Sequence, residues 1–344
     1  MQARTNGRET MAKVATLLSG KGIESITVSE AEVPQPGPGE ALVRIAGEGS
    51  SLIVTVDCGA MAHEALEMAR NAGADVIVVD HHKCISELPE TTGTVASDTF
   101  ATAVGQVAVA AGRDDSLPTL TGVHVDINEE TITLAATDRY RLAVREFIWS
   151  PATPGFTTQA LMRARTLADA AKSLVGVKNV SLSFAPATSH DRLAGFAGDG
   201  KSMTSRMLDG TFPPYRHLLP TETSTTAVVE VAPFLDSVRR VALVTDKTVP
   251  LRLEFKDGGV SLEAGAGEEA QATETIDVLL NGEPISIAFN PTFLTDGLQA
   301  VGTPFVQISF TGNNKPAILT GRTEPNGPSI ENYRYLLMPM RYAS

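Results

Sequence analysis

The sequence of 344 residues predicts an α+β fold in which two similar domains follow an N-terminal segment of a different, α/β type. Three observations support this prediction. An internal repeat with a period of about 128 residues runs through residues 94–344. Within each copy, short helices precede strands that alternate apolar and polar residues, as in antiparallel sheets with one face packed on helices. Residues 1–93 lack the repeat and show a strand, a helix and a second strand instead.

The N-terminal segment begins with two elements that lie outside any repeat. Residues 14–18 are consistent with a short helix ended by glycines, and residues 41–45 predict a strand after a turn rich in proline and glycine. Residues 51–57 and 75–80 then predict two buried strands, with a helix over residues 62–72 between them. This order predicts a βαβ unit with parallel strands.

Polar side chains stand at the carboxyl ends of these two strands. Asp57 ends the first, and Asp80, His81 and His82 end the second, which makes them weak candidates for a divalent metal site. These residues resemble the DHH phosphoesterases, single-strand-specific exonucleases above all. The family's Asp-x-Asp-Gly motif is absent, so a fragment unable to assemble two metals is the favoured interpretation. A DHH-type metal-dependent exonuclease or phosphoesterase with added domains is the alternative function.

The repeat follows an expected linker at residues 88–93. In its first half, a helix at residues 100–112 precedes a hairpin at 122–127 and 131–136. A helix at 234–244 precedes a hairpin at 250–255 and 259–264 in the same way. Two hairpins after two helices, in the same order and at the same spacing, predict two copies of one structural unit.

The second half of the repeat adds another helix and another strand pair. Residues 165–174, 180–184 and 192–196 correspond to residues 291–301, 306–310 and 316–320. Each domain therefore contains two helices packed on antiparallel sheets. The predicted boundaries are 1–93 for the unassigned segment, 94–216 for the central domain and 217–344 for the C-terminal domain.

The charge balance argues against bulk attraction to nucleic acid. Residues 1–96 hold 7 basic and 13 acidic residues, and the remainder holds 21 and 27, so each part carries a net charge of −6. Any DNA contact must therefore rest on the local placement of Arg and Lys, or on topology. The two cysteines, Cys58 and Cys84, form no disulfide framework, and we expect a cytoplasmic protein.

Two distant segments carry a further resemblance. Residues 137–144 read Thr-Asp-Arg-Tyr-Arg-Leu-Ala-Val, a polar and basic turn that continues into an apolar strand. Residues 335–341 read Tyr-Leu-Leu-Met-Pro-Met-Arg, an apolar tail whose proline prevents helix formation. Both resemble the bacterial β sliding clamp family, the non-catalytic processivity subunits of DNA polymerase III, over roughly residues 93–344. In that family three domains per chain and two chains form a ring around duplex DNA.

The resemblance implies that the two segments meet in a pocket for short peptide motifs of the polymerase α subunit and the clamp loader. An apolar tail is also compatible with a plain core strand, but two methionines suit an adaptable binding surface. Carried over from the family, the lining would be Leu120, Thr137, Arg139, Tyr140, Arg141, Leu142, Pro213, His217, Leu218, Leu336, Met338, Pro339, Met340 and Arg341.

The ring implied by the family would place cations of the repeated helices against the DNA phosphates. The candidates are Arg163, Arg165, Lys172, Arg239 and Arg240, for which a solvated helix face is the alternative interpretation. Leu243 and Val244 match the family's dimer interface. Because residues 1–93 do not resemble a clamp first domain, we expect a monomer or a weak, open dimer instead of the family's closed homodimer.

Residues 94–344 show no catalytic constellation. The three histidines there, His124, His190 and His217, stand apart from any recognisable nucleophile or metal spacing. We therefore expect no enzymatic activity, no cofactor and no membrane partner. The function indicated is that of a subunit of a DNA-directed DNA polymerase complex, in DNA replication.

Overall fold

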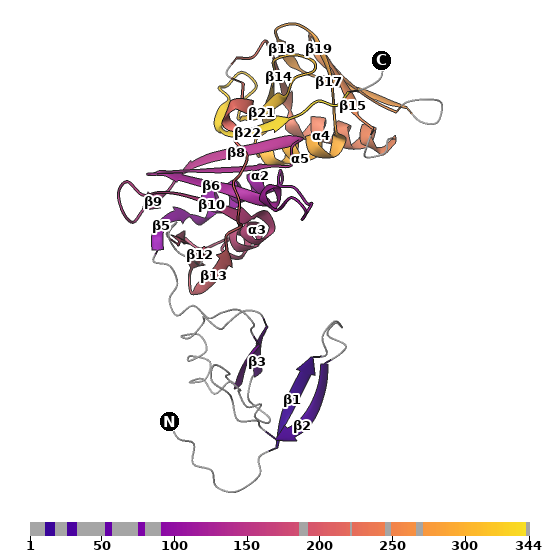
Figure 1. Cartoon of the computed structure of the whole chain (residues 1–344). Coiled ribbons are helices and arrows are strands. Elements are labelled where there is room, and N and C mark those ends of the chain that lie inside the picture. The colour runs from indigo at the N-terminus through magenta and orange to yellow at the C-terminus, as the bar shows by residue number, and fades with distance from the viewer. Residues whose placement is uncertain are drawn as a thin grey trace. The chain divides into compact units, whose positions relative to one another are not determined.

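The computed structural model describes residues 11–17, 26–32, 52–56, 75–79, 91–185, 192–220, 222–244, 249–265 and 271–341. The chain divides into two compact units, Met1–Leu88 and Pro89–Ser344, which are taken separately here (Figure 1). The predicted α+β class is confirmed for the larger unit, whose elements are helices and antiparallel sheets.

The described residues of the smaller unit form two strand pairs. β1 (Met11–Leu17) pairs antiparallel with β2 (Ile26–Glu32), and β3 (Leu52–Val56) pairs parallel with β4 (Asp75–Val79). The parallel pair confirms the two strands expected there and their parallel direction. The expected helix at residues 14–18 is wrong, because residues 14–17 belong to β1, while residue 18 lies outside the described residues; the β-branched Val14 and Thr16 favour a strand. The expected strand at 41–45, the helix at 62–72 and the candidate metal ligands Asp57, Asp80, His81 and His82 lie outside the described residues.

The central part of the chain begins one strand earlier than expected. β5 (Thr91–Ala96) includes Thr91–Gly93, so the linker predicted at residues 88–93 is wrong for these three residues. Gly93 fits here because an added Cβ would lie 2.4 Å from the Trp149 ring. The elements that follow are α2 (Ser97–Ala108), η2 (Pro118–Thr121), β6 (Gly122–Asn128), β7 (Thr131–Thr137), β8 (Arg141–Ile148), β9 (Ser150–Pro151), β10 (Thr157–Arg163), α3 (Ala164–Ser173), β11 (Asn179–Phe184), β12 (Leu193–Gly198) and β13 (Lys201–Arg206).

The C-terminal part repeats this order element by element, after the one-turn helix η3 (Arg216–Leu218). Its elements are β14 (Thr225–Glu230), α4 (Val231–Val241), η4 (Ala242–Val244), β15 (Leu251–Lys256), β16 (Gly259–Ala264), β17 (Ala272–Asp277), β18 (Leu279–Asn281), β19 (Ile285–Phe289), α5 (Pro291–Val301), β20 (Phe305–Phe310), β21 (Ala317–Arg322) and β22 (Ile330–Leu337). β5 thus corresponds to β14, and β13 to β22. The repeat that the sequence predicts is confirmed.

The sheets repeat as well. The order β10-β6-β7-β8 corresponds to β19-β15-β16-β17, and the order β13-β12-β11-β5-β9 corresponds to β22-β21-β20-β14-β18. β8 and β22 also pair with each other, antiparallel, with Leu142 opposite Leu336 (Figure 1). One four-stranded and one five-stranded sheet thereby join into a nine-stranded sheet.

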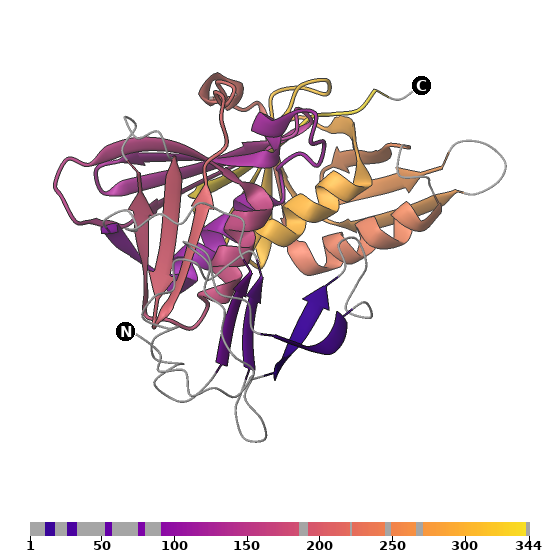
Figure 2. The same cartoon turned by 60° about the horizontal axis from the view of Figure 1, so that its bottom comes forward.

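The helices α2, α3, α4 and α5 of the larger unit gather on one face of its sheets (Figure 2). α2 contacts α3, α5 contacts α4, and α2 also contacts α5 across the junction of the two parts. Phe100 of α2 and Phe234 of α4 occupy matching positions and are almost fully buried, as are Leu167 of α3 and Leu294 of α5. Burial of each such side chain contributes about 1.5–3 kcal/mol.

One continuous apolar core lies between helices and sheets. A smaller second cluster lies apart from it around the β8–β22 junction and consists of Ala135, Leu142, Val144, Leu161, Phe212, Tyr215, Ile318 and Leu336. Among the described residues, no helix has the length and hydropathy needed to cross a membrane.

Candidate functional site

The turn between β7 and β8 is held by its own side chains. The Thr137 hydroxyl donates to the Arg141 carbonyl at 2.6 Å, and Asp138 Oδ1 accepts from the N–H groups of Tyr140 and Arg141 at 3.0 and 3.1 Å. Arg139 adopts a left-handed conformation, with φ of 80°, that only a tight turn imposes on a residue with a side chain. This geometry leaves the side chains of Arg139 and Tyr140 exposed beside a rigid backbone.

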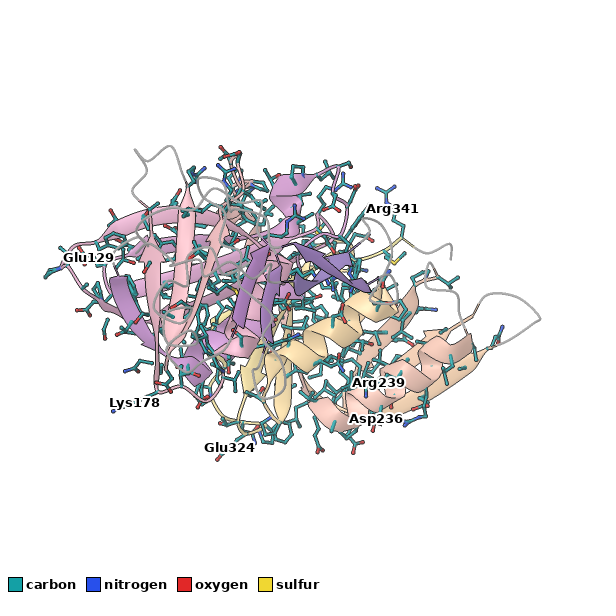
Figure 3. The ribbon with its side chains drawn as sticks, turned by 90° about the horizontal axis from the view of Figure 1, so that it is seen from below. Glu129, Lys178, Asp236, Arg239, Glu324 and Arg341 are labelled. Atoms are coloured by element: carbon teal, nitrogen blue, oxygen red, sulfur yellow. The ribbon has the colours of Figure 1, made fainter. Side chains whose placement is uncertain are left out.

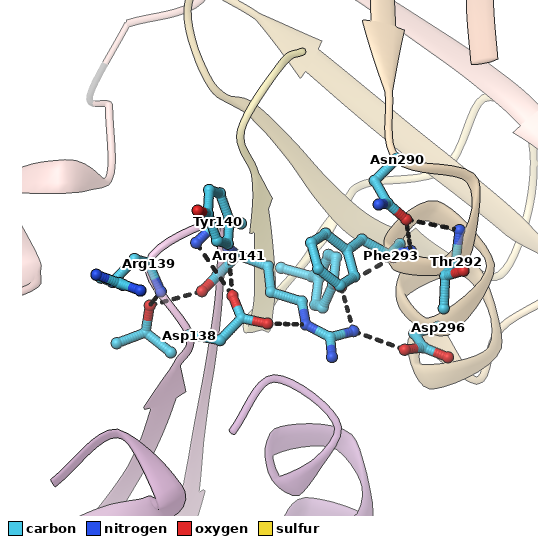
Figure 4. Close-up of polar contacts among 10 residues, drawn as sticks. Asp138, Arg139, Tyr140, Arg141, Asn290, Thr292, Phe293 and Asp296 are labelled. Carbon is cyan, nitrogen blue, oxygen red and sulfur yellow. Dashed lines mark hydrogen bonds and ion pairs between the residues drawn. The ribbon is translucent and has the colours of Figure 1, made fainter. Parts of the chain in front are cut away.

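Arg141 is only 4% exposed and lies between two carboxylates (Figure 4). Its guanidinium contacts Asp138 at 2.8 Å and Asp296 of α5 at 2.6 Å. Burial opposes the charge, but Tyr335, Asp296 and Asp138 outweigh it and raise the pKa of Arg141. The residue predicted as part of the pocket lining therefore also ties the turn to α5.

The first turn of α5 completes this arrangement. Asn290 caps the helix, since its side chain accepts from the N–H groups of Thr292 and Phe293 at 2.9 and 3.2 Å (Figure 4). The Phe293 ring lies 4.3 Å from the Arg141 guanidinium carbon and stacks on Tyr140, with 6.3 Å between ring centroids. The sequence analysis assigned these α5 residues only to a helix. The Asn-Pro start of the helix was a signal, because it fixes where the first turn of the helix begins.

The C-terminal tail meets the turn directly. Beyond the β8–β22 pairing, the Met338 N–H donates to the Tyr140 carbonyl at 2.9 Å, and the Met340 N–H donates to the Ala288 carbonyl at 2.8 Å. Met338 is 40% exposed and Tyr140 is 57% exposed. The structure therefore brings together the two segments that the sequence analysis paired.

The residues predicted as lining fall into several environments. A cavity of about 330 Å³ is lined by four of them, Leu120, Arg139, Tyr140 and Arg141, together with Thr292, Phe293 and Asp296. A second cavity, of about 520 Å³, contains Pro213 and His217. Leu142 and Leu336 belong to the buried cluster at the junction. Thr137 is buried, Leu218, Met338 and Arg341 are exposed, and Pro339 and Met340 are half-buried.

His124 lies in the second cavity and packs on aromatic residues. Its ring stacks on Phe212 with 5.2 Å between centroids, and Tyr215 meets both rings edge-on. Burial lowers the pKa of His124 and favours the neutral imidazole. Its packing identifies it as a structural residue.

The five cations proposed for DNA contact all have exposed side chains on or beside α3 and α4. Arg163 pairs with Asp115 at 3.0 Å, and Arg239 lies 3.7 Å from Asp236 on the outer side of α4 (Figure 3). The Arg240 guanidinium donates two hydrogen bonds of 2.7 Å to the carboxylate of Glu274 on β17. Arg165 and Lys172 lie on α3. Leu243, expected at a dimer interface, is 83% exposed in η4, and Val244 packs partly against the core.

Three family models match the chain. The model for the C-terminal domain of the DNA polymerase III beta subunit matches residues 216–341, and the model for its central domain matches residues 94–214. The model for the N-terminal domain of the DHH family matches residues 6–136, which overlaps the central-domain match. Among the described residues, no three His, Cys, Asp or Glu side chains group as a metal site would require.

Curated relatives and solved structures agree with the clamp models. The beta sliding clamp of Streptomyces coelicolor is 49% identical over 263 residues, which cover 76% of this chain and 70% of the relative. The beta sliding clamp homolog GriR of Streptomyces muensis is 39% identical over 268 residues, 78% of this chain and 71% of the relative. The sliding clamp structure of Bacillus subtilis superposes with a TM-score of 0.68 at 23% identity, over 77% of this chain and 69% of that one.

The fold and the junction of repeated domains are those of a DNA sliding clamp. The chain belongs to the β sliding clamp family, the beta subunits of DNA polymerase III. Its function is therefore that of a non-catalytic processivity subunit in DNA replication, and the alternative exonuclease function is not favoured.

Proposed function

We propose that the turn at residues 138–140, the tail at residues 338–341 and the first turn of α5 form the site through which this clamp subunit holds its peptide partners. The partners are short linear motifs of the polymerase α subunit and of the clamp loader. The observation that carries the proposal is the pairing of exposed Tyr140 and Met338 across one backbone hydrogen bond, beside a cavity of about 330 Å³.

The site offers apolar contact without a free buried charge. Arg141 is already neutralised by Asp138 and Asp296, so an apolar side chain entering the cavity does not have to separate an ion pair from water. Tyr140 and Phe293 supply aromatic surface, and Met338 supplies an adaptable side chain. Leucine or phenylalanine anchors of a peptide suit such a surface.

The same proposal places double-stranded DNA against the helix face. Arg163, Arg165, Lys172, Arg239 and Arg240 would contact phosphates without reading bases. Three of these cations, Arg163, Arg239 and Arg240, already pair with carboxylates, which weakens their attraction for phosphate. Weak, sequence-independent contacts suit a clamp that slides.

The remaining assignments follow from this function. The central clamp domain is proposed to span residues 94–216 and the C-terminal domain residues 217–344, with residues 1–93 in place of a first clamp domain. The chain needs no cofactor and works in the cytoplasm, where replication takes place in bacteria.

Calorimetry with a synthetic peptide that contains a glutamine and leucine and phenylalanine anchors tests the peptide site. Tyr140→Ala and Met338→Ala should each weaken binding roughly 5- to 30-fold, since truncation of an interface anchor costs about 1–2 kcal/mol. Ile148→Ala is the matched control, because Ile148 is 67% exposed at the opposite end of β8. Unchanged affinity in both site variants, with intact circular dichroism, would refute the assignment.

A further inference from the structure

The backbone of Arg139, in the turn between β7 and β8, has a conformation that a side chain disfavours. Its φ is 80°, whereas the left-handed region open to residues with a Cβ spans about 50–70°. A glycine reaches this conformation without strain, because it has no Cβ. Strain of this kind persists where the surrounding structure imposes it, and it concentrates at binding sites. An arginine at this position therefore implies a role for the side chain that outweighs the strain.

The turn does not depend on the arginine side chain. The Arg139 N–H donates to the Thr137 hydroxyl at 3.1 Å, and Asp138 Oδ1 accepts from the next two N–H groups at 3.0 and 3.1 Å. All of these contacts use backbone N–H groups and the side chains of residues 137 and 138. A glycine at position 139 would make the same hydrogen bond, so the local fold does not account for an arginine there.

The Arg139 guanidinium is unused within the part of the chain that the structure describes. Its side chain is exposed and forms no hydrogen bond or ion pair with the described residues. Figure 4 shows it pointing away from the pair formed by Arg141 and Asp296. Arg113, on the loop after α2, is also exposed and has no such partner among those residues. Two positively charged groups are therefore available to a ligand.

Both groups line the cavity of about 330 Å³ that also contains Tyr140 and Phe293. Its charged residues are three arginines and three aspartates, namely Arg113, Arg139, Arg141, Asp114, Asp138 and Asp296. Each aspartate already accepts a hydrogen bond, from the Ser116 N–H in one case and from Arg141 in the other two. The charges of this lining that have no hydrogen-bond partner among the described residues are therefore both positive, in a chain whose net charge is −12.

Asp114 is the carboxylate of this lining that the charge of Arg139 reaches. Hydrogen bonds from Ser116 lower the pKa of Asp114 most, and the charge of Arg139 lowers it further. The two side chains nevertheless form no ion pair in the described structure, and Asp114 is exposed. Because water and salt screen the attraction between exposed charges, Asp114 competes only weakly with an incoming carboxylate for the Arg139 guanidinium.

We propose that Arg139, together with Arg113, selects partner peptides that carry an aspartate or glutamate next to their apolar anchors. The inference rests on the peptide site proposed above and names the partner that this site prefers. The apolar anchors enter the cavity, and the carboxylate stays at its mouth, where a guanidinium donates two parallel hydrogen bonds to it. Charges at the rim of an interface set the preference among partners and the rate of association more than the overall affinity.

Calorimetry with three peptides on the full chain tests this preference at a salt concentration of about 50 mM. The first peptide contains the glutamine and the leucine and phenylalanine anchors, with a serine on each side. In the second and third peptides, an aspartate replaces the serine before or after the anchors. At least one aspartate peptide should bind roughly three- to fivefold more tightly than the serine peptide. The advantage should shrink at about 0.5 M salt, because salt screens exposed charges.

Variants at position 139 assign the preference to this side chain. Arg139→Gln should remove the advantage of the aspartate peptide and change the affinity for the serine peptide by less than about 1.5-fold, since the guanidinium meets no charge there. Arg139→Glu should reverse the preference toward a peptide with lysine in place of aspartate. Arg113→Gln should reduce the advantage in part. Arg206→Gln, which changes an exposed arginine of β13, is the matched control and should retain it.

The outcomes separate this inference from the site on which it rests. Equal affinity for all three peptides, or an advantage that survives Arg139→Gln, overturns the inference and leaves the peptide site standing. Binding of none of the peptides removes the site and the inference together. Arg139→Gly tests the strain, because it should be at least as stable as the parent chain in urea while it loses the preference. A less stable Arg139→Gly variant would show that the side chain supports the turn, which also contradicts the inference.

Discussion

The central and C-terminal parts share one order of strands and helices but differ in the chemistry of their edges. β8 reads Arg-Leu-Ala-Val-Arg-Glu-Phe-Ile, and its first four residues are buried against β22. Its counterpart β17 reads Ala-Thr-Glu-Thr-Ile-Asp and alternates half-buried with exposed residues. β22 has a buried apolar half, whereas its counterpart β13 is polar and charged.

The difference shows how one fold can supply both a permanently paired strand and a strand whose chemistry suits contact with water. Apolar edges that are always paired cannot separate without exposing a core, here the cluster around Leu142 and Leu336. Polar edges remain compatible with water and guard against random strand pairing. The pairing of β8 with β22 therefore belongs to folding, whereas the composition of β17 and β13 is compatible with contact with water.

Replacement of Arg141 should have the largest effect, because this residue joins the paired edge to α5. Arg141→Met leaves Asp138 and Asp296 without their common partner, and both carboxylates are largely buried. Breaking such a pair costs about 3–5 kcal/mol, and we expect a value of about 3 kcal/mol because Asp296 retains some contact with water. The full chain is denatured with urea and followed through the fluorescence of Trp149, which lies in the larger unit. The experiment therefore measures the free energy of unfolding of residues 89–344.

Two companion variants separate the ion pair from general damage at the turn. Arg139→Met changes an exposed neighbour in the same turn and should alter stability by less than about 0.5 kcal/mol. The triple variant Asp138→Asn, Arg141→Met, Asp296→Asn removes all three charges and should recover part of the loss. A free energy for Arg141→Met equal to that of Arg139→Met would mean that the ion pair contributes nothing to the junction.

Gly297 should give the next largest effect and tests the repeat at a position where its two copies differ. Gly297 lies in α5, and an added Cβ would come within 2.5 Å of the Tyr335 ring. Tyr335 is fully buried and its hydroxyl donates to the Phe293 carbonyl at 2.9 Å, so the ring cannot move away freely. Overpacking costs about 1–3 kcal/mol, and improved helix propensity returns up to about 1 kcal/mol. Gly297→Ala should therefore destabilise by about 1–2 kcal/mol in the same denaturation experiment.

The counterpart of Gly297 in the first copy supplies the control. Ala170 of α3 holds that position, and Met203 stands where Tyr335 stands. Gly297→Ala combined with Tyr335→Met imitates the first copy, and it should be more stable than the sum of its single changes predicts. Strict additivity would show that the clash with the ring does not determine the choice of glycine.

The repeat could be predicted from the sequence because its helices and strands follow local sequence patterns. The helix at 291–301 and the strand at 259–264 are found with the predicted bounds, since Asn290-Pro291 marks a helix start and alternation marks a half-buried strand. Strands such as β10, β14 and β19 were missed. Their pairing partners lie far away in the sequence, as with β10 and β6, and no hairpin turn marks them.

Only part of the candidate site could be predicted from the sequence, for a related reason. The two distant segments were paired because they resemble a family, whereas the sequence gives no local sign that Asp296 neutralises Arg141. Ion pairs between residues this far apart depend on the tertiary fold, so the sequence predicted Arg141 as a pocket residue but not that it also holds the turn to α5. The error at residues 14–18 had a different cause: a seven-residue antiparallel register with β2 outweighed a weak helix signal.

The smallest expected effect concerns a charge pair on β17, which pairs only with β16 among the described strands. Glu274 accepts two hydrogen bonds from Arg240 and another from Ser237, and these lower the pKa of its carboxyl to about 2. Because the folded-state pKa is depressed, the stabilisation is present above the ordinary glutamate pKa of about 4.3 and is lost as the pH falls toward 2. Arg240 is exposed and Glu274 is partly exposed, so solvent screens the pair and the effect on the free energy of unfolding should be small.

Carbon-detected NMR titration of the glutamate carboxyls measures this pKa directly. In Arg240→Gln the pKa of Glu274 should rise toward its ordinary value, and the two proteins should differ in stability above about pH 4 but converge near pH 2. Arg239→Gln changes the neighbouring cation, which pairs with Asp236 instead, and is the matched control. An unchanged pKa of Glu274 in Arg240→Gln would show that β17 has no preformed charge pair. The difference between a charged β17 and the apolar β8–β22 junction would then rest on sequence alone.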